Sequence, residues 1–295
     1  MGRGGGAIGA GGGAVEAEIK RLEDEYGTGE IDAAQAEAIT NRWRQDFRDT
    51  PEGQAVDGIQ QSWSASSNIE GGHVMHEWAA TRFGYRGTIW TRRNEEGQPR
   101  RFSGAREIRR FNDGYTFRRQ VAPGYGRIDR ETAFRGLDRQ YAFTQYILGR
   151  QGVPAMTLYR GIGGRSLGNT VNRIPAGGTL RATVGVNPTS SWSGSTSAAV
   201  NFARSAQSRT RPGVVLSTRL PRSDILFTQR TAVNSVFQHS FRREMEVVPV
   251  MRGRATVNLQ RVADFDKRTK GRQARGVLRL NVHIDASRSD ADWLK

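Results

Sequence analysis

Apolar side chains recur at helical spacing near the start of the chain. The ranges 15–26 and 31–47 follow this pattern and predict two polar helices, separated by glycines, with Asp32 in position to cap the second. Weaker helical patterns cover 54–63 and 76–83. The first part of the chain is therefore expected to be mainly helical.

The clearest amphipathic pattern covers 129–149, just before the middle of the chain. Asp129 is placed to cap its N-terminus and Gly149 to end it. An apolar run, 153–160, follows directly and predicts a buried strand. The sequence thus predicts a helix that leads straight into a strand ending at Arg160.

Short strand patterns dominate the remainder of the chain. A helix is predicted at 195–205. Strands are predicted at 214–220, 246–250, 255–262 and 276–284. Runs of short strands with one or two helices are typical of an α+β fold.

Composition divides the chain into three parts. Residues 1–14 are nearly all glycine and alanine and predict a flexible Gly-rich leader, too poor in leucine-like residues for the core of a signal peptide. The mainly helical region is expected at 15–128, with a role that the sequence leaves open, and a second domain at 129–295. No segment approaches the roughly 18 to 20 apolar residues of a membrane span.

The charge is strongly positive. Lysine and arginine together number 45 against 29 acidic residues, a net charge of +16, and only four of the 45 are lysine, so 41 are arginine. This excess favours an anionic partner such as nucleic acid, a dinucleotide or an acidic membrane face; codon bias in a GC-rich genome is the alternative explanation. The absence of cysteine excludes disulfides, a cysteine nucleophile and thiolate metal sites.

Two glutamates open the strand pattern near residue 246. Glu244 and Glu246 are one residue apart, so alternation along a strand places both on one face. Neighbouring like charges raise each other's pKa and destabilise a strand unless a cation lies between them. The pair therefore indicates chemistry; a salt-bridged strand edge facing Arg242 and Arg243 is the alternative.

Two other motifs precede this pair. Arg160 and Gly161 end an apolar run, and the hydroxyl cluster 189–191 precedes the helical pattern at 195–205. An arginine, a hydroxyl cluster and Glu-x-Glu, in this order, resemble the Arg, Ser-Thr-Ser and Glu-x-Glu signature of mono-ADP-ribosyltransferases. The resemblance covers roughly 154–284.

The resemblance implies both a fold and an activity. The implied core consists of two antiparallel sheets packed across each other with flanking helices, and NAD binds in the cleft between the sheets. The implied reaction transfers ADP-ribose from NAD, as substrate, to a target macromolecule and releases nicotinamide, without a metal. The bond to nicotinamide breaks through a state with positive charge on the ribose, which the site must stabilise.

The resemblance also assigns the NAD-binding residues. Arg160 would clamp the phosphate or ribose side of NAD, and Gly161 would let the backbone approach the nicotinamide carboxamide. Thr189, Ser190 and Ser191 would support the catalytic glutamate and the nicotinamide ribose. Because Thr-Ser-Ser replaces Ser-Thr-Ser, either Thr189 or Ser190 holds the leading position.

A literal Ser-Thr-Ser occurs at 195–197. It lies where the following helix is expected to begin, so a helix cap explains it better.

The glutamate pair and two aromatic residues complete the implied site. Glu246 would accept a hydrogen bond from the ribose and stabilise the developing positive charge. Glu244 would orient or deprotonate the acceptor, and a glutamate at this earlier position implies an arginine side chain as acceptor. Phe237 and Phe241 would recognise the acceptor on the preceding loop; core packing is an equal alternative for them.

The target and setting stay open. A protein with an acceptor arginine, possibly associated with nucleic acid, reconciles the glutamate pair with the basic charge, and RNA or DNA is the other acceptor class. The sequence is compatible with a free toxin, a secretion-system effector or a phage-delivered enzyme. Such a protein would be secreted, delivered into a target cell or packaged in a virion. The alternative function is a non-enzymatic, basic nucleic-acid-binding or virion-internal protein.

A possible metal pair lies elsewhere. His73 and His76 have a spacing that two ligands on one helix can show, but no third ligand is evident nearby. No metal is expected.

Overall fold

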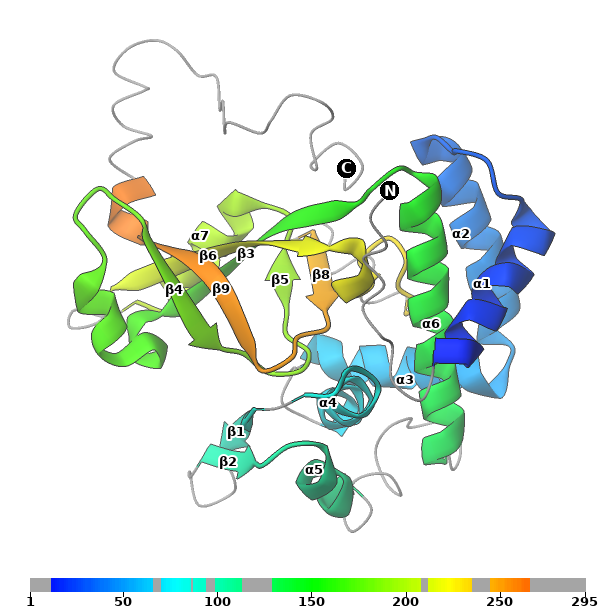
Figure 1. Cartoon of the computed structure of the whole chain (residues 1–295), viewed down its shortest axis with the longest axis horizontal. Helices are drawn as coiled ribbons and strands as arrows, with labels where there is room; N and C mark the ends of the chain where they lie inside the picture. The colour runs from blue at the N-terminus through cyan, green and yellow to red at the C-terminus, as the bar shows by residue number, and fades with distance from the viewer. Residues whose placement is uncertain are drawn as a thin grey trace.

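The computed structural model describes residues 12–65, 70–85, 87–93, 99–112, 129–207, 212–234 and 245–265. The predicted strand at 276–284 lies outside these residues, as do the three predicted site residues Phe237, Phe241 and Glu244. The fold is α+β, with the helices of the first half of the chain gathered at one end and along one side of a sheet (Figure 1).

The structure confirms the four helices predicted in the N-terminal region, although the last begins at residue 70 rather than at 76. They are α1 (Gly12–Tyr26), α2 (Ala33–Arg48), α3 (Pro51–Ala65) and α4 (Glu70–Phe83). Asp32 caps α2: its side chain accepts from the backbone N–H of Gln35, and the Gln35 side chain accepts from the backbone N–H of Asp32. This capping box satisfies two N–H groups that the helix start would otherwise leave open.

Helix α6 (Arg130–Arg150) links the helical part to the sheet. Asp129 caps it through the backbone N–H of Thr132, as predicted. The helix ends at Arg150 rather than at Gly149, and Gly152, with φ of 69°, supplies the left-handed turn into the next strand. Its side chains are buried along most of its length because it packs against α1 and α3 on one side and β7 on another.

One sheet of seven strands forms the second half. Its strands are β3 (Ala155–Gly163), β4 (Leu180–Gly185), β5 (Trp192–Ser193), β6 (Gly213–Pro221), β7 (Ile225–Thr228), β8 (Glu246–Pro249) and β9 (Arg254–Arg261). The order is β4-β9-β6-β3-β5-β8-β7, and every neighbouring pair is antiparallel.

The prediction of two separate packed sheets differs from this structure. The two parts of the sheet, β4-β9-β6-β3 and β5-β8-β7, belong to one hydrogen-bonded order. They join through a single residue pair, Tyr159 with Ser193, because β5 is only two residues long. The sheet is thus continuous but narrow at this junction.

Helix α7 (Thr196–Ser205) lies directly against β3 and β6. Ser195 caps it, which confirms that the literal Ser-Thr-Ser at 195–197 begins a helix. Two glycines allow the close packing: a Cβ on Gly161 would collide with the carbonyl of Ala199, and a Cβ on Gly213 with that of Ala203. Two 3-10 segments, Gly164–Arg173 and Arg222–Asp224, flank β3 and β7.

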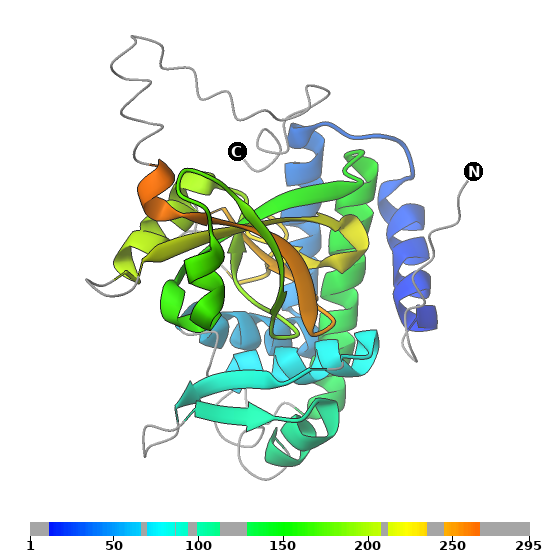
Figure 2. The ribbon, with the colours of Figure 1, turned by 60° about the vertical axis from the view of Figure 1, so that its left-hand side comes forward.

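A small module that the sequence pattern did not predict lies beside α4. Strands β1 (Ile89–Arg93) and β2 (Pro99–Phe102) pair antiparallel, and α5 (Ala105–Phe111) follows them (Figure 2). Ile89, Phe102 and Ile108 form its small core, into which Tyr85 and Ala80 also pack.

The main hydrophobic core crosses from the helices into the sheet. It takes side chains from α1 to α4, from α6 and from β7 and β8, among them Val15, Trp43, Val56, Trp78, Phe143, Phe227 and Val248. The expected boundary between residues 128 and 129 therefore passes through one continuous core. Among the described helices, none is long and apolar enough to cross a membrane.

Candidate active site

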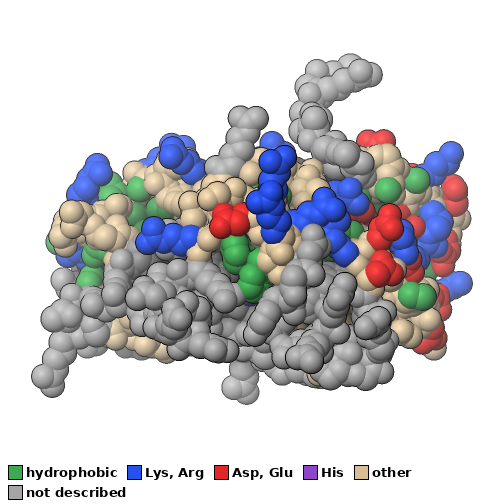
Figure 3. Space-filling model, turned by 90° about the horizontal axis from the view of Figure 1, so that it is seen from below, with side chains coloured by type: hydrophobic (Ala, Val, Ile, Leu, Met, Phe, Trp, Pro, Cys, Tyr) green, Lys and Arg blue, Asp and Glu red, His purple; other side chains and the backbone are tan. Residues whose placement is uncertain are grey.

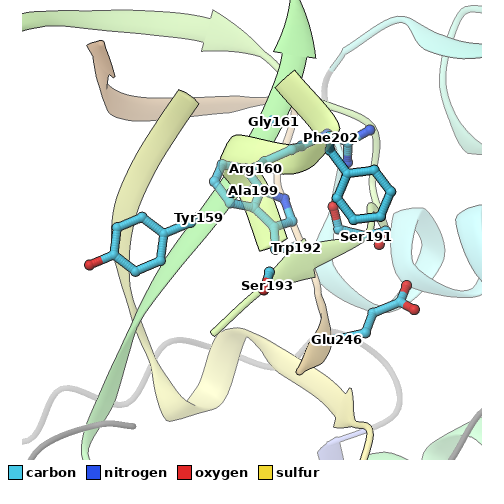
Figure 4. Close-up of a pocket in the computed structure, with 9 residues that line it drawn as sticks. All are labelled: Tyr159, Arg160, Gly161, Ser191, Trp192, Ser193, Ala199, Phe202 and Glu246. Carbon is cyan, nitrogen blue, oxygen red and sulfur yellow. The ribbon is translucent and has the colours of Figure 1, made fainter. Parts of the chain in front are cut away.

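A pocket of about 200 Å³ lies where β3, β5 and β8 meet the start of α7 (Figure 4). It sits at the narrow junction of the sheet. Its walls are Tyr159, Arg160, Gly161, Ser191, Trp192, Ser193, Ala199, Phe202 and Glu246. Its volume is below the roughly 300–1,000 Å³ of a site that encloses a drug-sized ligand, so it has room only for a smaller group.

Arg160 supplies the positive charge of this pocket. Its guanidinium donates a hydrogen bond to the backbone carbonyl of Ser191 over 3.0 Å, which ties β3 to the segment that enters β5. Burial lowers the pKa of Arg160, and the nearby carboxylate of Glu246 opposes that effect. An arginine stays protonated near neutral pH despite such a shift, so the pocket keeps a cation.

Glu246 supplies the negative charge. It is the first residue of β8, and only 4% of its surface is exposed. The indole Nε1 of Trp63, on α3, donates to its Oε1 over 3.2 Å. A buried carboxylate needs such partners because leaving it unpaired is costly.

The backbone bends sharply just before Glu246. Met245 has φ of 49°, and it is the one non-glycine residue with positive φ in the part of the chain that the structure describes. Its carbonyl accepts from the backbone N–H of Gly194 over 2.9 Å, which fixes the bend against the end of β5. Side chains disfavour this conformation, and such strain persists where the surrounding structure enforces it, often at functional sites.

Two serine residues line the pocket, Ser191 and Ser193. Thr189 and Ser190 are both buried and lie outside its lining, so neither candidate for the leading position of the motif is part of this wall. Ser193 was not among the predicted site residues, although it stands in the same hydroxyl-rich run.

Thr189 instead contacts the helical part of the molecule. Its hydroxyl lies 2.7 Å from Nδ1 of His76, on α4, and its backbone N–H donates to the same nitrogen over 3.3 Å. Because a backbone N–H can only donate, Nδ1 is the unprotonated nitrogen. Burial lowers the pKa of His76 to about 3, with smaller contributions from His73 and Arg160.

Phe202 stands at the mouth of the pocket. Its side chain is 48% exposed, and no other large hydrophobic side chain among the described residues is comparably exposed. Figure 4 shows Phe202, Ser191 and Glu246 turned towards the same space, whereas Tyr159 points away from it. An exposed aromatic ring beside a pocket offers a flat surface for stacking.

The structure brings together four of the predicted residues, Arg160, Gly161, Ser191 and Glu246. The residues that sequence reasoning missed are Trp63, Trp192, Ser193 and Phe202. Ser193 follows the hydroxyl cluster 189–191 by two residues and Phe202 lies in the helix predicted at 195–205, so both had a weak signal. Trp63 had none, because its contact depends on tertiary structure.

The chemistry of the pocket follows from its groups. A guanidinium binds a phosphate or a sugar hydroxyl, and the serine hydroxyls add donors and acceptors. A buried carboxylate stabilises positive charge that develops beside it, and more strongly than in water. The described residues contain no group of three or more metal-ligating side chains, and Nδ1 of His76 is occupied by Thr189.

Comparison of the chain with protein-family models, curated proteins and solved structures gives no match.

Proposed function

We propose that this protein transfers ADP-ribose from NAD to a target macromolecule, most readily to an arginine side chain of a protein, and releases nicotinamide. The observation that carries the proposal is the convergence of Arg160, Ser191 and Glu246 in one pocket. These residues come from three motifs that are far apart in the sequence, and all three line the same pocket.

The dimensions and charges of the pocket support a role for NAD. A volume of about 200 Å³ suits the nicotinamide ring and its ribose, with the rest of the dinucleotide lying outside. Arg160 would bind the phosphate or ribose side, and the exposed ring of Phe202 would stack on a planar group. Ser191 and Ser193 would hydrogen-bond the ribose.

Glu246 would carry the central electrostatic role. Its carboxylate would accept a hydrogen bond from a ribose hydroxyl and stabilise the positive charge that forms on the sugar as the bond to nicotinamide breaks. The acceptor nitrogen then attacks the same carbon and loses a proton, which Glu244 would take. Glu244, Phe237 and Phe241 lie outside the described residues, so their roles rest on the sequence alone.

The distribution of charge on the surface supports a proposal about the target. On the face seen in Figure 3, lysine and arginine side chains lie along the coloured part, while most acidic side chains gather towards one end. Such a surface favours a polyanion nearby. We therefore propose a protein target associated with nucleic acid, for a toxin, effector or phage-delivered enzyme.

A non-enzymatic nucleic-acid-binding protein is the second candidate, and the net charge of +16 favours it. Both candidates predict binding that weakens with salt. Catalysis separates them, because only an enzyme consumes NAD.

The test is incubation of the protein with labelled NAD and a whole-cell lysate, beside the variant Glu246→Gln. We expect labelled protein bands and free nicotinamide with the wild type alone, and the same folded structure in both. Retained transfer in the folded variant would contradict the role of Glu246. Labelled RNA without labelled protein would contradict the arginine target, and absence of any NAD cleavage by the wild type would favour the second candidate.

A further inference from the structure

Helix α3 directs three side chains, at intervals of three residues, towards the second half of the chain: Asp57, Gln60 and Trp63. Residues three apart lie on the same helix face. All three make hydrogen bonds to residues that lie more than 170 positions later in the chain. A helix of the N-terminal region, whose role the sequence left open, is thus in direct contact with the candidate site.

The first two contacts hold the chain that follows β7. Oε1 of Gln60 accepts from the backbone N–H groups of Val233 and Asn234 over 2.8 and 2.9 Å. The side chain of Asn234 donates to the carboxylate of Asp57 over 3.1 Å. These bonds satisfy buried backbone groups and fix the position at which this chain leaves the sheet.

The third contact reaches the carboxylate itself. Trp63 is buried, with 3% of its surface exposed, and its ring packs edge-on against His76 with 6.1 Å between ring centroids. Packing therefore fixes the direction of its indole N–H, which donates to Glu246. An indole N–H is a donor only, so this contact fixes which atom of Glu246 accepts and restricts the rotation of the carboxylate.

Helix α4 makes a second supporting contact next to that of Trp63. His76 binds Thr189, two residues before Ser191, whose carbonyl in turn binds Arg160. Helices α3 and α4 therefore support the segment that enters β5 and the first residue of β8, and these two strands pair with each other.

We propose that helix α3 is a component of the catalytic centre and that Trp63 is a positioning residue, which holds the carboxylate of Glu246 in its working orientation. The inference rests on the proposed function. It assigns a role in turnover to a helix that lies outside all three motifs of the resemblance.

The test is the variant Trp63→Phe, which keeps a packed ring and removes only the N–H donor and some ring volume. We expect kcat for nicotinamide release to fall roughly 10- to 100-fold, the range expected for loss of a hydrogen bond to a charged group. KM for NAD should change by less than about threefold, because Trp63 does not line the pocket.

The matched control is Trp43→Phe. Trp43 is also buried in the helical part, and its Nε1 has no hydrogen-bond partner among the described residues. This variant makes the same chemical change away from the pocket, so its kcat should equal that of the wild type. Equal losses of kcat in both variants, or a loss confined to KM in Trp63→Phe, would overturn the inference.

A double-mutant cycle on thermal stability tests the contact without relying on activity. Trp63→Phe, Glu246→Leu and the double variant are compared with the wild type. We expect the effect of Trp63→Phe on Tm to be smaller in the Glu246→Leu background. Additive shifts would contradict the contact. If the wild type does not cleave NAD, both the proposed function and the role of Trp63 in turnover are contradicted. If the wild type cleaves NAD and the Trp63→Phe variant is fully active, only the role of Trp63 is contradicted.

Discussion

Ser193 lies directly opposite Glu246 in the antiparallel pair of β5 and β8. Opposite residues of such a pair project to the same face with Cβ atoms about 5 Å apart. The hydroxyl of Ser193 also donates to the carbonyl of Ser195 over 3.1 Å and accepts from its backbone N–H over 2.8 Å. One side chain thus belongs both to the pocket wall and to the turn that starts α7.

Replacement of Ser193 by alanine should therefore affect stability and turnover together. We expect a loss of about 1 kcal/mol in the free energy of unfolding, for the lost turn hydrogen bonds, and a several-fold loss of nicotinamide release. Denaturant unfolding and an NAD cleavage assay measure the two effects.

Ser191→Ala is the comparison, because the contact of Ser191 with Arg160 uses its backbone carbonyl and survives the change. It should lower turnover with little change in stability. The reverse pattern in the two variants would show that the two serine residues have been assigned the wrong roles.

Gly161 should not tolerate even a methyl group. A Cβ at this position would meet the backbone carbonyl of Ala199, and backbone atoms of a packed helix cannot move aside at low cost. We expect Gly161→Ala to lower the free energy of unfolding by about 1–3 kcal/mol and to displace α7 from the pocket. Gly185→Ala is the control, since its Cβ would meet no atom within 4 Å, and thermal unfolding of both variants gives the comparison.

His76 should make stability depend on pH below about 6.5. Its pKa falls from 6.5 to about 3 in the folded protein because of burial, so between these values the unfolded chain binds a proton that the folded protein does not. The contribution of neutral, buried His76 to the free energy of unfolding is therefore fully present above pH 6.5. As the pH falls below this value, the free energy of unfolding decreases by up to about 1.4 kcal/mol per pH unit.

Removal of the imidazole tests this dependence. The variant His76→Gln should lose less stability than the wild type between pH 6.5 and 4.5, measured as the change in free energy from denaturant unfolding. Parallel curves for the two proteins would mean that folding does not lower the pKa of His76.

Met245 should prefer small or flexible replacements. Glycine adopts a φ of 49° without strain, whereas a β-branched side chain does so only with difficulty. We expect Met245→Val to be less stable than Met245→Gly by about 1 kcal/mol, and to cleave NAD more slowly because Glu246 follows directly. Unfolding and activity measurements on the two variants, with the wild type as reference, check both statements. Equal stability of the two variants would remove the argument for strain.

Local signals explain what was predictable from sequence. The caps Asp32, Asp129 and Ser195 and the long apolar stripe of α6 depend on neighbours within a few residues, and the structure confirms them. The paired strands β1 and β2 were missed because they are short and lie in a part of the sequence that mixes glycine, arginine and aromatic residues without a sustained period.

The set of side chains that line the pocket depends on the register of the strands, which cannot be read from the sequence. Four of the five residues at 189–193 carry a hydroxyl group, and the sequence alone does not show which of them face a cavity. In the structure, Ser191 and Ser193, at the start and end of the segment that contains the two-residue strand β5, line the pocket. The contact between Trp63 and Glu246 joins residues 183 positions apart, and no local pattern marks either as a partner of the other. Sequence reasoning therefore found the charged groups and missed the residue that orients one of them.

That separation also sets an order of events during synthesis. At the usual rate of about 5–20 residues per second, Glu246 leaves the ribosome on the order of 10 to 40 s after Trp63. Helices α3 and α4 are thus made long before the strand they support, and Arg160 is made before the carboxylate that shares its pocket. A growing chain that has not yet reached residue 246 therefore has the supporting helices and Arg160 but lacks the carboxylate that completes the wall of the pocket.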